Sequence, residues 1–157
     1  MLLCFLRHAE AEHTGGADSE RRLSLKGVDQ AGRVGRFLEK SRLVPELILT
    51  SPILRARQTA DIIAAILKVP LRELPWLACG MDEEDCLAQL ASYAEHEHVL
   101  LIGHEPDLSE AIAHLIGLSD PSAIKIRKAS LTGVEVADLH PGCGLLHFCV
   151  PVRLMQP

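Results

Sequence analysis

The stretch LLCFLRHAEA (residues 2–11) decides how the rest of this chain is interpreted. Five consecutive apolar residues, Leu2–Leu6, predict a strand that is covered on both faces, because a half-exposed strand would alternate polar and apolar positions. The strand delivers two polar side chains, Arg7 and His8, to its carboxyl end. A buried strand that ends in an Arg-His pair raises the question of what those two groups do there.

Further strands and helices follow in alternation. Apolar runs predict strands over Glu46–Thr50 and His98–Ile102. Apolar residues at helical spacing predict helices over Lys26–Lys40, from Ser51-Pro52 to near Val69-Pro70, over Asp82–Ala94 and over Pro106–Ile116. Segments 131–139 and 145–152, joined by a Pro-Gly-Cys-Gly turn, predict antiparallel strands. The expected fold class is α/β: a three-layer αβα sandwich whose mostly parallel central sheet has antiparallel edge strands at the C-terminus, forming one domain over residues 1–157.

Composition narrows the function classes. The chain of 157 residues has 16 Lys and Arg against 21 Asp and Glu, a formal net charge of −5, which is unlike the basic footprint of a nucleic-acid binder. Its five cysteines are odd in number and never in CxxC spacing, which argues against a disulfide framework or a zinc site and favours free thiols in the cytoplasm. No apolar stretch approaches the ~18 residues of a membrane span. We expect no nucleic-acid partner and no membrane contact.

Three predicted strand ends carry the polar chemistry. The first ends in Arg7-His8, the second leads into SPILRARQTA (residues 51–60) with Arg55, and the third leads into GHEP (residues 103–106) with His104. In open α/β sheets, ligands bind beyond the carboxyl ends of the strands, so these loops should converge. Two imidazoles and several guanidiniums at one crevice suit phosphate. Arg57, two positions after Arg55, faces about 200° away on a helix and is expected at the surface.

Together these segments resemble a known family. LRHAEA (residues 6–11), SPILRARQTA, GHEP and SERRLSLKG (residues 19–27) are similar to the signature segments of the histidine phosphatase superfamily, phosphoglycerate mutase-like, and of its short SixA-type phosphohistidine phosphatase branch. Ala9 stands where the family pattern has glycine. The resemblance implies an αβα fold, His8 as the phosphorylated nucleophile, and Arg7, Arg55 and His104 as the rest of the catalytic, phosphate-binding pocket. It also implies an arginine near the phosphate in the 19–27 segment, which can be Arg21 or Arg22.

General chemistry agrees with these roles. A neutral imidazole attacks phosphorus through one ring nitrogen while the other holds the proton, and arginine forks bind phosphate oxygens in pairs. Phosphoryl transfer needs positioning and positive charge, which Arg7 and Arg55 would supply. His104 would help most when protonated, giving a bell-shaped pH profile. No residue pattern calls for a metal or other cofactor, and none is expected.

The general acid is left open. Glu10, Asp18 and Glu105 are candidates and none stands out, whereas an alkoxide leaving group needs a proton far more than imidazole does. The interval between Arg55 and His104 is short, so it holds no lid and the pocket should be open to a histidine on another protein. We therefore expect a metal-independent phosphatase that hydrolyses phosphohistidine on a protein. The alternatives are a phosphatase of small phosphomonoesters and a non-catalytic module that binds phosphate or phosphoproteins.

Overall fold

A computed structural model describes residues 1–13 and 17–156 of the chain. The strands are β1 (Leu2–Arg7), β2 (Leu47–Thr50), β3 (Leu71–Glu73), β4 (His98–Gly103), β5 (Leu131–Val136) and β6 (Gly144–Val150), and the helices are α1 (Leu25–Lys40), α2 (Leu54–Leu67), α3 (Glu83–Leu90) and α4 (Asp107–Ile116). The strands form one sheet in the order β3-β2-β4-β1-β5-β6. β1 to β4 are parallel to one another, and β5 and β6 run antiparallel at one edge. The predicted fold class is confirmed.

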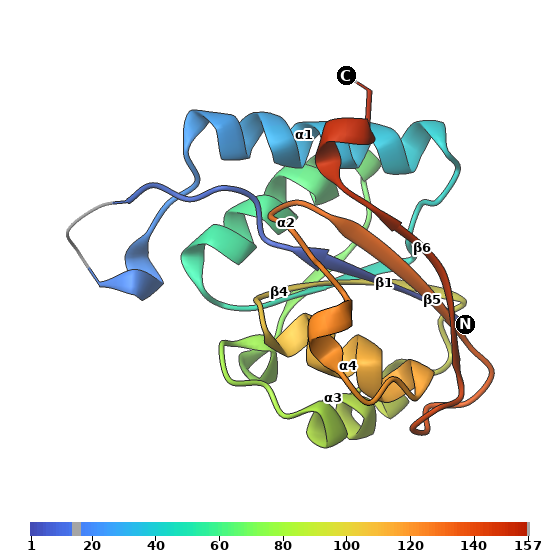
Figure 1. Ribbon diagram of the computed structural model, residues 1–157. Coiled ribbons are helices and arrows are strands. Elements are labelled where there is room, and N and C mark those ends of the chain that lie inside the picture. Colours follow the sequence, from blue (N-terminus) through green and yellow to red (C-terminus); the bar gives the residue numbers. More distant parts are fainter. Residues whose placement is uncertain (14–16, 157) are drawn as a thin grey trace.

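Both faces of the sheet are covered, as the continuous apolar run in β1 requires. Alternate side chains of β1 point to opposite faces. Leu3 and Phe5 belong to the core shared with α3 and α4, whereas Cys4 and Leu6 belong to the core shared with α1 and α2. Figure 1 shows these two helical layers on either side of the sheet. Because no face of β1 meets water, apolar residues are needed at every position.

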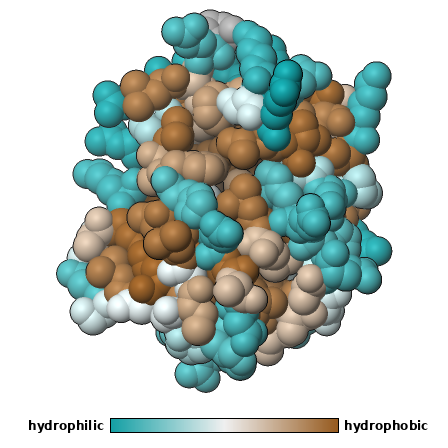
Figure 2. Space-filling model, turned by 90° about the vertical axis from the view of Figure 1, so that its right-hand side faces the viewer, coloured by the Kyte–Doolittle hydropathy of each residue, from teal (hydrophilic) through white to brown (hydrophobic). Residues whose placement is uncertain are grey.

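The surface shows no single large apolar region on the side that Figure 2 presents. This is the right-hand side of Figure 1, where the chain starts, and brown apolar atoms there lie in patches between teal polar groups. None of the helices in the described part of the chain is long and apolar enough to cross a membrane.

The start of α2 differs from the prediction. The helix was expected at Ser51-Pro52 but begins at Leu54, with Ile53 as its capping residue. Ser51 does not cap it in the usual way, because its Oγ accepts a hydrogen bond from the Ile53 N–H (3.2 Å) and also contacts the imidazole of His104 (2.8 Å). The predicted helix over 82–94 is likewise shorter, since α3 ends at Leu90 and a 3-10 turn follows. Sequence periodicity does not distinguish that turn from a longer helix.

Candidate active site

His8 directly follows β1 and is held by both of its ring nitrogens. Its backbone N–H donates to the Gly103 carbonyl on β4 (3.0 Å), which fixes the main chain at the sheet edge. Its Nδ1 donates to the Ala9 carbonyl oxygen (2.7 Å), and its Nε2 accepts from the Nε–H of Arg55 (3.2 Å). Because a guanidinium can only donate, Nε2 must hold a lone pair. Both contacts therefore require the same neutral tautomer, in which Nε2 is unprotonated and its lone pair accepts from Arg55.

The second imidazole lies beside the first. The ring centroids of His8 and His104 are 5.2 Å apart and the planes are tilted by 50°. The Nε2 of His104 contacts the Ser51 hydroxyl, whereas its Nδ1 is buried and has no hydrogen-bond partner among the described residues. A buried ring nitrogen without a partner is costly. The Ser51 hydroxyl thus fixes the orientation of the His104 ring beside His8.

Both imidazoles are neutral near pH 7 in this arrangement. Burial is the largest cause for each, and it lowers the pKa of His8 to about 3 and that of His104 to about 4, with the positive charge of Arg55 acting in the same direction. Neutrality suits a nucleophile. For His104, the protonated form expected from the sequence needs the negative charge of a bound phosphate, because the free site disfavours it.

Arg55 stands at the start of α2 and uses every part of its guanidinium. Besides the bond from Nε to His8, its Nη1 donates to the Asp18 carbonyl (2.7 Å) and its Nη2 lies 3.0 Å from the Asp18 carboxylate. Nη2 also contacts the Cys79 sulfur at 3.7 Å. The side chain is only 7% exposed. Asp18 therefore occupies donors that a phosphate would need, and the substrate must displace this carboxylate or share Arg55 with it.

Thr59 and Ser51, which the sequence did not indicate as residues of the site, hold this arrangement together. The Thr59 hydroxyl donates to the Arg55 carbonyl (2.7 Å) and accepts from the Ala9 N–H (3.1 Å), so it links helix α2 to the nucleophile loop. Ser51 orients His104 as described above. Spacing could have indicated Thr59, because it lies one helical turn after Arg55 and on the same face.

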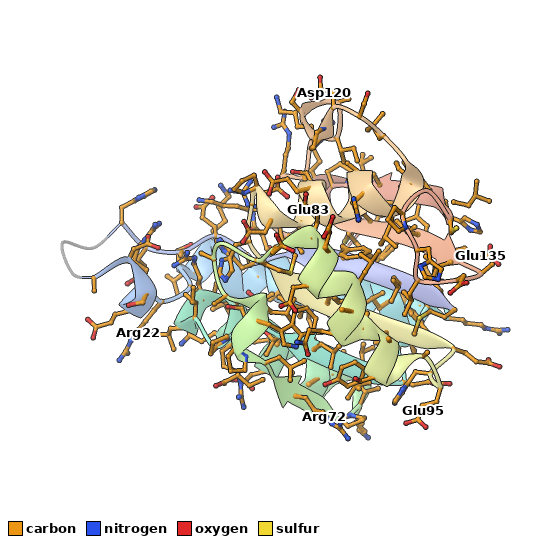
Figure 3. All side chains as sticks on the ribbon, turned by 90° about the horizontal axis from the view of Figure 1, so that it is seen from below. Arg22, Arg72, Glu83, Glu95, Asp120 and Glu135 are labelled. Atoms are coloured by element: carbon orange, nitrogen blue, oxygen red, sulfur yellow. The ribbon has the colours of Figure 1, made fainter. Side chains whose placement is uncertain are left out.

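Arg7 and Arg21 lie at different distances from the chemistry. Arg7 donates from Nη1 to the Ile126 carbonyl (3.0 Å), and its Nε is buried without a partner among the described residues. Arg21 donates hydrogen bonds to the Asp18 carboxylate (2.9 Å) and to the Glu12 carbonyl (2.7 Å). Asp18 therefore lies between Arg21 and Arg55 and contacts both. Arg22 is exposed and extends away from the loop (Figure 3). Of the two alternatives in the 19–27 segment, the structure brings Arg21 toward the site.

The three candidate acids have different environments. Lys26 lies 3.0 Å from Glu10 and lowers its pKa, and Arg21 followed by Arg55 lowers that of Asp18. Burial raises the pKa of Glu105, whose Oε2 accepts from the Ser109 hydroxyl (2.8 Å) and whose Oε1 is buried without a partner among the described residues. Only Glu105 is shifted in the direction that favours a general acid.

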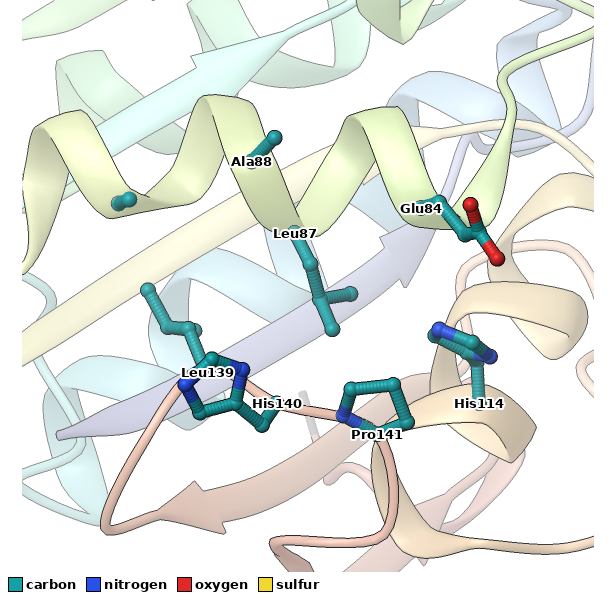
Figure 4. Close-up of a pocket in the computed structure, with 8 residues that line it drawn as sticks. Glu84, Leu87, Ala88, His114, Leu139, His140 and Pro141 are labelled. Carbon is teal, nitrogen blue, oxygen red and sulfur yellow. The ribbon is translucent and has the colours of Figure 1, made fainter.

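In the described residues, no three His, Cys, Asp or Glu side chains lie close enough together to hold a metal ion. A mostly apolar pocket of about 400 Å³ lies between α3, α4 and the turn around Pro141 (Figure 4). It contains none of the residues of the candidate site. Arg57 lies at the surface as predicted, where it pairs with Asp61 and Glu73.

Comparison with known proteins identifies the class of protein that this fold and site define. The family model of the histidine phosphatase superfamily (branch 1) matches residues 3–78. An uncharacterized protein of Picosynechococcus sp. is 32% identical over 143 residues, covering 86% of this chain and 85% of the relative. The chain belongs to the histidine phosphatase superfamily, as its signature segments predicted.

Within that superfamily the chain is similar to SixA proteins. The phosphohistidine phosphatase SixA of Escherichia coli is 29% identical over 119 residues, covering 73% of this chain and 74% of the relative. A solved structure of the protein histidine phosphatase SixA complexed with tungstate superposes with a TM-score of 0.90 at 24% identity, covering 99% of this chain and 100% of that one. The predicted resemblance to the short SixA-type branch is confirmed.

Proposed function

We propose that this chain is a metal-independent phosphatase that hydrolyses phosphohistidine on a protein. The observation that carries the proposal is the state of His8: its Nδ1 is fixed by the Ala9 carbonyl, and its Nε2 is unprotonated and faces the guanidinium of Arg55. Binding alone would need only the arginines. A nucleophile held in one tautomer is needed only for turnover, which disfavours the non-catalytic module.

The reaction takes place in two displacements. First, the Nε–H of Arg55 turns from His8 Nε2 to the phosphoryl oxygens, the freed Nε2 lone pair attacks phosphorus, and the P–N bond of the substrate breaks. The leaving imidazole nitrogen takes the electron pair and then a proton from water. Second, water attacks phosphorus, the bond to His8 Nε2 breaks, and inorganic phosphate leaves. Arg55 and Arg7 stabilise the negative charge on the phosphoryl oxygens in both steps. His104 offers its unpartnered Nδ1 to the same group.

Several observations support a protein-borne histidine as substrate. The segment between Arg55 and His104 is used by α2, β3, α3, β4 and short turns of the sandwich itself, so it supplies no long inserted lid. The similar SixA proteins include one named phosphohistidine phosphatase and one solved with tungstate, an oxyanion. The free thiols of all five cysteines fit a reducing compartment, and we place the reaction in the cytoplasm.

The test is to trap the phosphorylated enzyme. The protein is mixed with a ³²P-labelled phosphohistidine carrier protein, quenched in alkali after milliseconds, and separated on a denaturing gel. We expect an alkali-stable, acid-labile label on the wild type and on His140→Ala, whose imidazole is exposed, and none on His8→Ala. Full turnover by His8→Ala would refute the proposed role of His8. Phosphate release from sugar phosphates but not from the carrier would refute the proposed substrate.

A phosphatase of small phosphomonoesters is the second candidate, and one observation favours it. The half-buried carboxyl of Glu105 has a raised pKa and directly follows His104, so it can hold the proton that an alkoxide leaving group requires. If esters are substrates, Glu105→Gln should slow alkyl phosphates strongly and leave activated aryl phosphates nearly unchanged. Equal rates for both classes in this variant would remove the observation that supports this alternative.

A further inference from the structure

A cleft of about 440 Å³ lies next to Arg7 and is built from three segments that are far apart in the sequence. Its walls are the first turns of α1, the residues just before β5 and the tail after β6; Figure 1 shows the C-terminal tail lying against α1. The lining residues are Arg7, Lys26, Gln30, Arg127, Lys128, Pro151, Val152 and Arg153. We call these eight residues the basic cleft. Arg7 lines the cleft and directly precedes His8 in the chain, so the cleft adjoins the candidate active site.

The charge of the cleft runs against the charge of the whole molecule. Five of its eight residues are cationic, although the chain has a net charge of −5. Lys26 pairs with Glu10 at 3.0 Å, and Lys128 acts on the same carboxylate at longer range, whereas no ion pair within 4 Å involves Arg127, Lys128 or Arg153 among the described residues. Like charges gathered in this way repel one another, and a cleft lined by one sign of charge raises the local concentration of ligands of the opposite sign.

The cationic loop is fixed to the nucleophile. The Ala129 N–H donates to the carbonyls of both Arg7 (3.0 Å) and His8 (3.3 Å), and the Ser130 N–H closes the turn on the Arg127 carbonyl (2.9 Å). Ala129 adopts a left-handed conformation (φ 55°) to make this turn. The backbone of the turn that carries Arg127 and Lys128 is therefore anchored to the residues at the end of β1.

The tail is fastened as well. Arg33 of α1 donates from Nε (3.1 Å) and Nη2 (2.6 Å) to the Met155 carbonyl, and residues Val152–Leu154 form a 3-10 turn. Within this turn the side chain of Val152 is buried, whereas that of Arg153 is exposed. The backbone of the tail that carries Arg153 is thus anchored, as is that of the loop that carries Arg127 and Lys128.

We infer that the basic cleft docks an acidic segment of the substrate protein, with the phosphohistidine of that protein held in the neighbouring site. This inference rests on the proposed function. A site for one phosphate uses buried donors that converge on a point, but Lys26, Arg127 and Arg153 are exposed side chains along a wide cleft. Exposed cations of this kind attract an extended anionic surface, and they give specificity and a faster encounter. Aspartate and glutamate side chains beside the phosphorylated histidine match this chemistry.

The test compares two double variants with the same change in charge. Arg127→Glu with Arg153→Glu reverses two cations of the cleft. Lys68→Glu with Arg72→Glu reverses two exposed cations at the other edge of the sheet, where Figure 3 shows Arg72. Each enzyme is assayed at 50 and 300 mM NaCl with p-nitrophenyl phosphate, with a phosphohistidine carrier protein that has acidic residues around its histidine, and with the same carrier after those residues are changed to amides.

We expect the cleft variant to lower kcat/KM for the acidic carrier about 10-fold or more, because reversed charges repel the partner. Hydrolysis of p-nitrophenyl phosphate should stay within about 2-fold, since that ester reaches only the catalytic residues. The control variant should keep the wild-type kcat/KM for the acidic carrier. On the amide carrier, the wild type and the cleft variant should have similar kcat/KM. High salt should slow the wild type on the acidic carrier, because charges more than about 8–10 Å apart are screened.

Two results would overturn the inference. Equal activity of wild type and cleft variant on the acidic carrier would show that the cleft does not dock it. A loss of the same size on the acidic and the amide carrier would show that the cleft does not act through acidic residues of the partner. Failure of the proposed function looks different, because the wild type itself would then hydrolyse p-nitrophenyl phosphate and leave the carrier untouched.

Discussion

Mild acid should destabilise this protein before its carboxylates titrate, because His8 and His104 are buried as neutral imidazoles. Burial holds the pKa of His8 at about 3 and that of His104 at about 4, below the value of 6.5 that each has in an unfolded chain. Between pH 6.5 and about 4 the unfolded chain therefore binds protons at these two imidazoles that the folded chain does not bind. Stability is lost as the pH falls through that window.

The size of the effect follows from the two shifts. On going from pH 7.5 to 5.5, each imidazole that is protonated only in the unfolded chain removes about 1.4 kcal/mol, so the pair removes about 3 kcal/mol. That is a large share of the roughly 5–15 kcal/mol of a typical domain. His98, whose pKa burial also lowers, acts in the same direction, whereas the raised pKa of Glu105 opposes them.

Urea denaturation at pH 7.5, 6.5 and 5.5 measures this loss, with unfolding followed by the fluorescence of the single tryptophan, Trp76, and by circular dichroism. Phosphate buffer must be avoided, because a ligand of the folded state would add stability of its own. The variants His8→Asn and His104→Asn should each flatten the pH dependence by about one proton, whereas His140→Asn, an exposed histidine, should leave it unchanged. A wild-type slope in both site variants would refute the claim that these imidazoles are buried and neutral.

Three substitutions test the site directly. Arg55→Lys keeps the positive charge but loses the donors that reach His8 Nε2 and a phosphate together, so kcat/KM should fall about 10²-fold. Asp18→Asn removes the carboxylate that occupies Arg55, so inorganic phosphate should inhibit at several-fold lower concentration. Gly27→Ala places a methyl group against the Glu10 carbonyl, so the free energy of unfolding should fall by about 1–3 kcal/mol and turnover should fall with it.

Two of these three substitutions have a matched control. Arg57→Lys changes a surface arginine of the same helix and should keep full activity. Gly32→Ala lies in the same helix as Gly27, but its added methyl meets only the end of the Arg36 side chain, so it should not destabilise. For Asp18→Asn, a large fall in kcat with unchanged phosphate inhibition would contradict the competing role and indicate an acid. Normal activity in Arg55→Lys would place Arg55 outside the chemistry.

The sequence by itself determined the fold class and the main catalytic candidates. The continuous apolar run of β1 is typical of a strand that is covered on both faces, and the carboxyl ends of parallel strands meet at one edge of the sheet. Those two constraints bring together Arg7, His8, Arg55 and His104, and the structure places the two imidazoles side by side. The alternation of elements is local information, so it can be read without knowing which segments touch.

Contacts between distant segments were decided only by the tertiary structure. Ser51 has the local signature of a helix cap, but His104, 53 positions later in the chain, uses its hydroxyl instead. Asp18 was a candidate acid in the sequence, but the fold sets its carboxylate against Arg21 and Arg55, and these two guanidiniums lower its pKa.

The basic cleft gave no sequence signal at all. Its cations stand singly or in pairs around positions 26, 127 and 153, in a chain whose total charge is negative. Charge density on a surface depends on which segments pack together, and contacts between distant segments bring these cations to one place, among them the turn at Ala129 and the Arg33–Met155 hydrogen bonds. Local patterns determine which elements form, whereas packing determines the electrostatic surface that a partner meets.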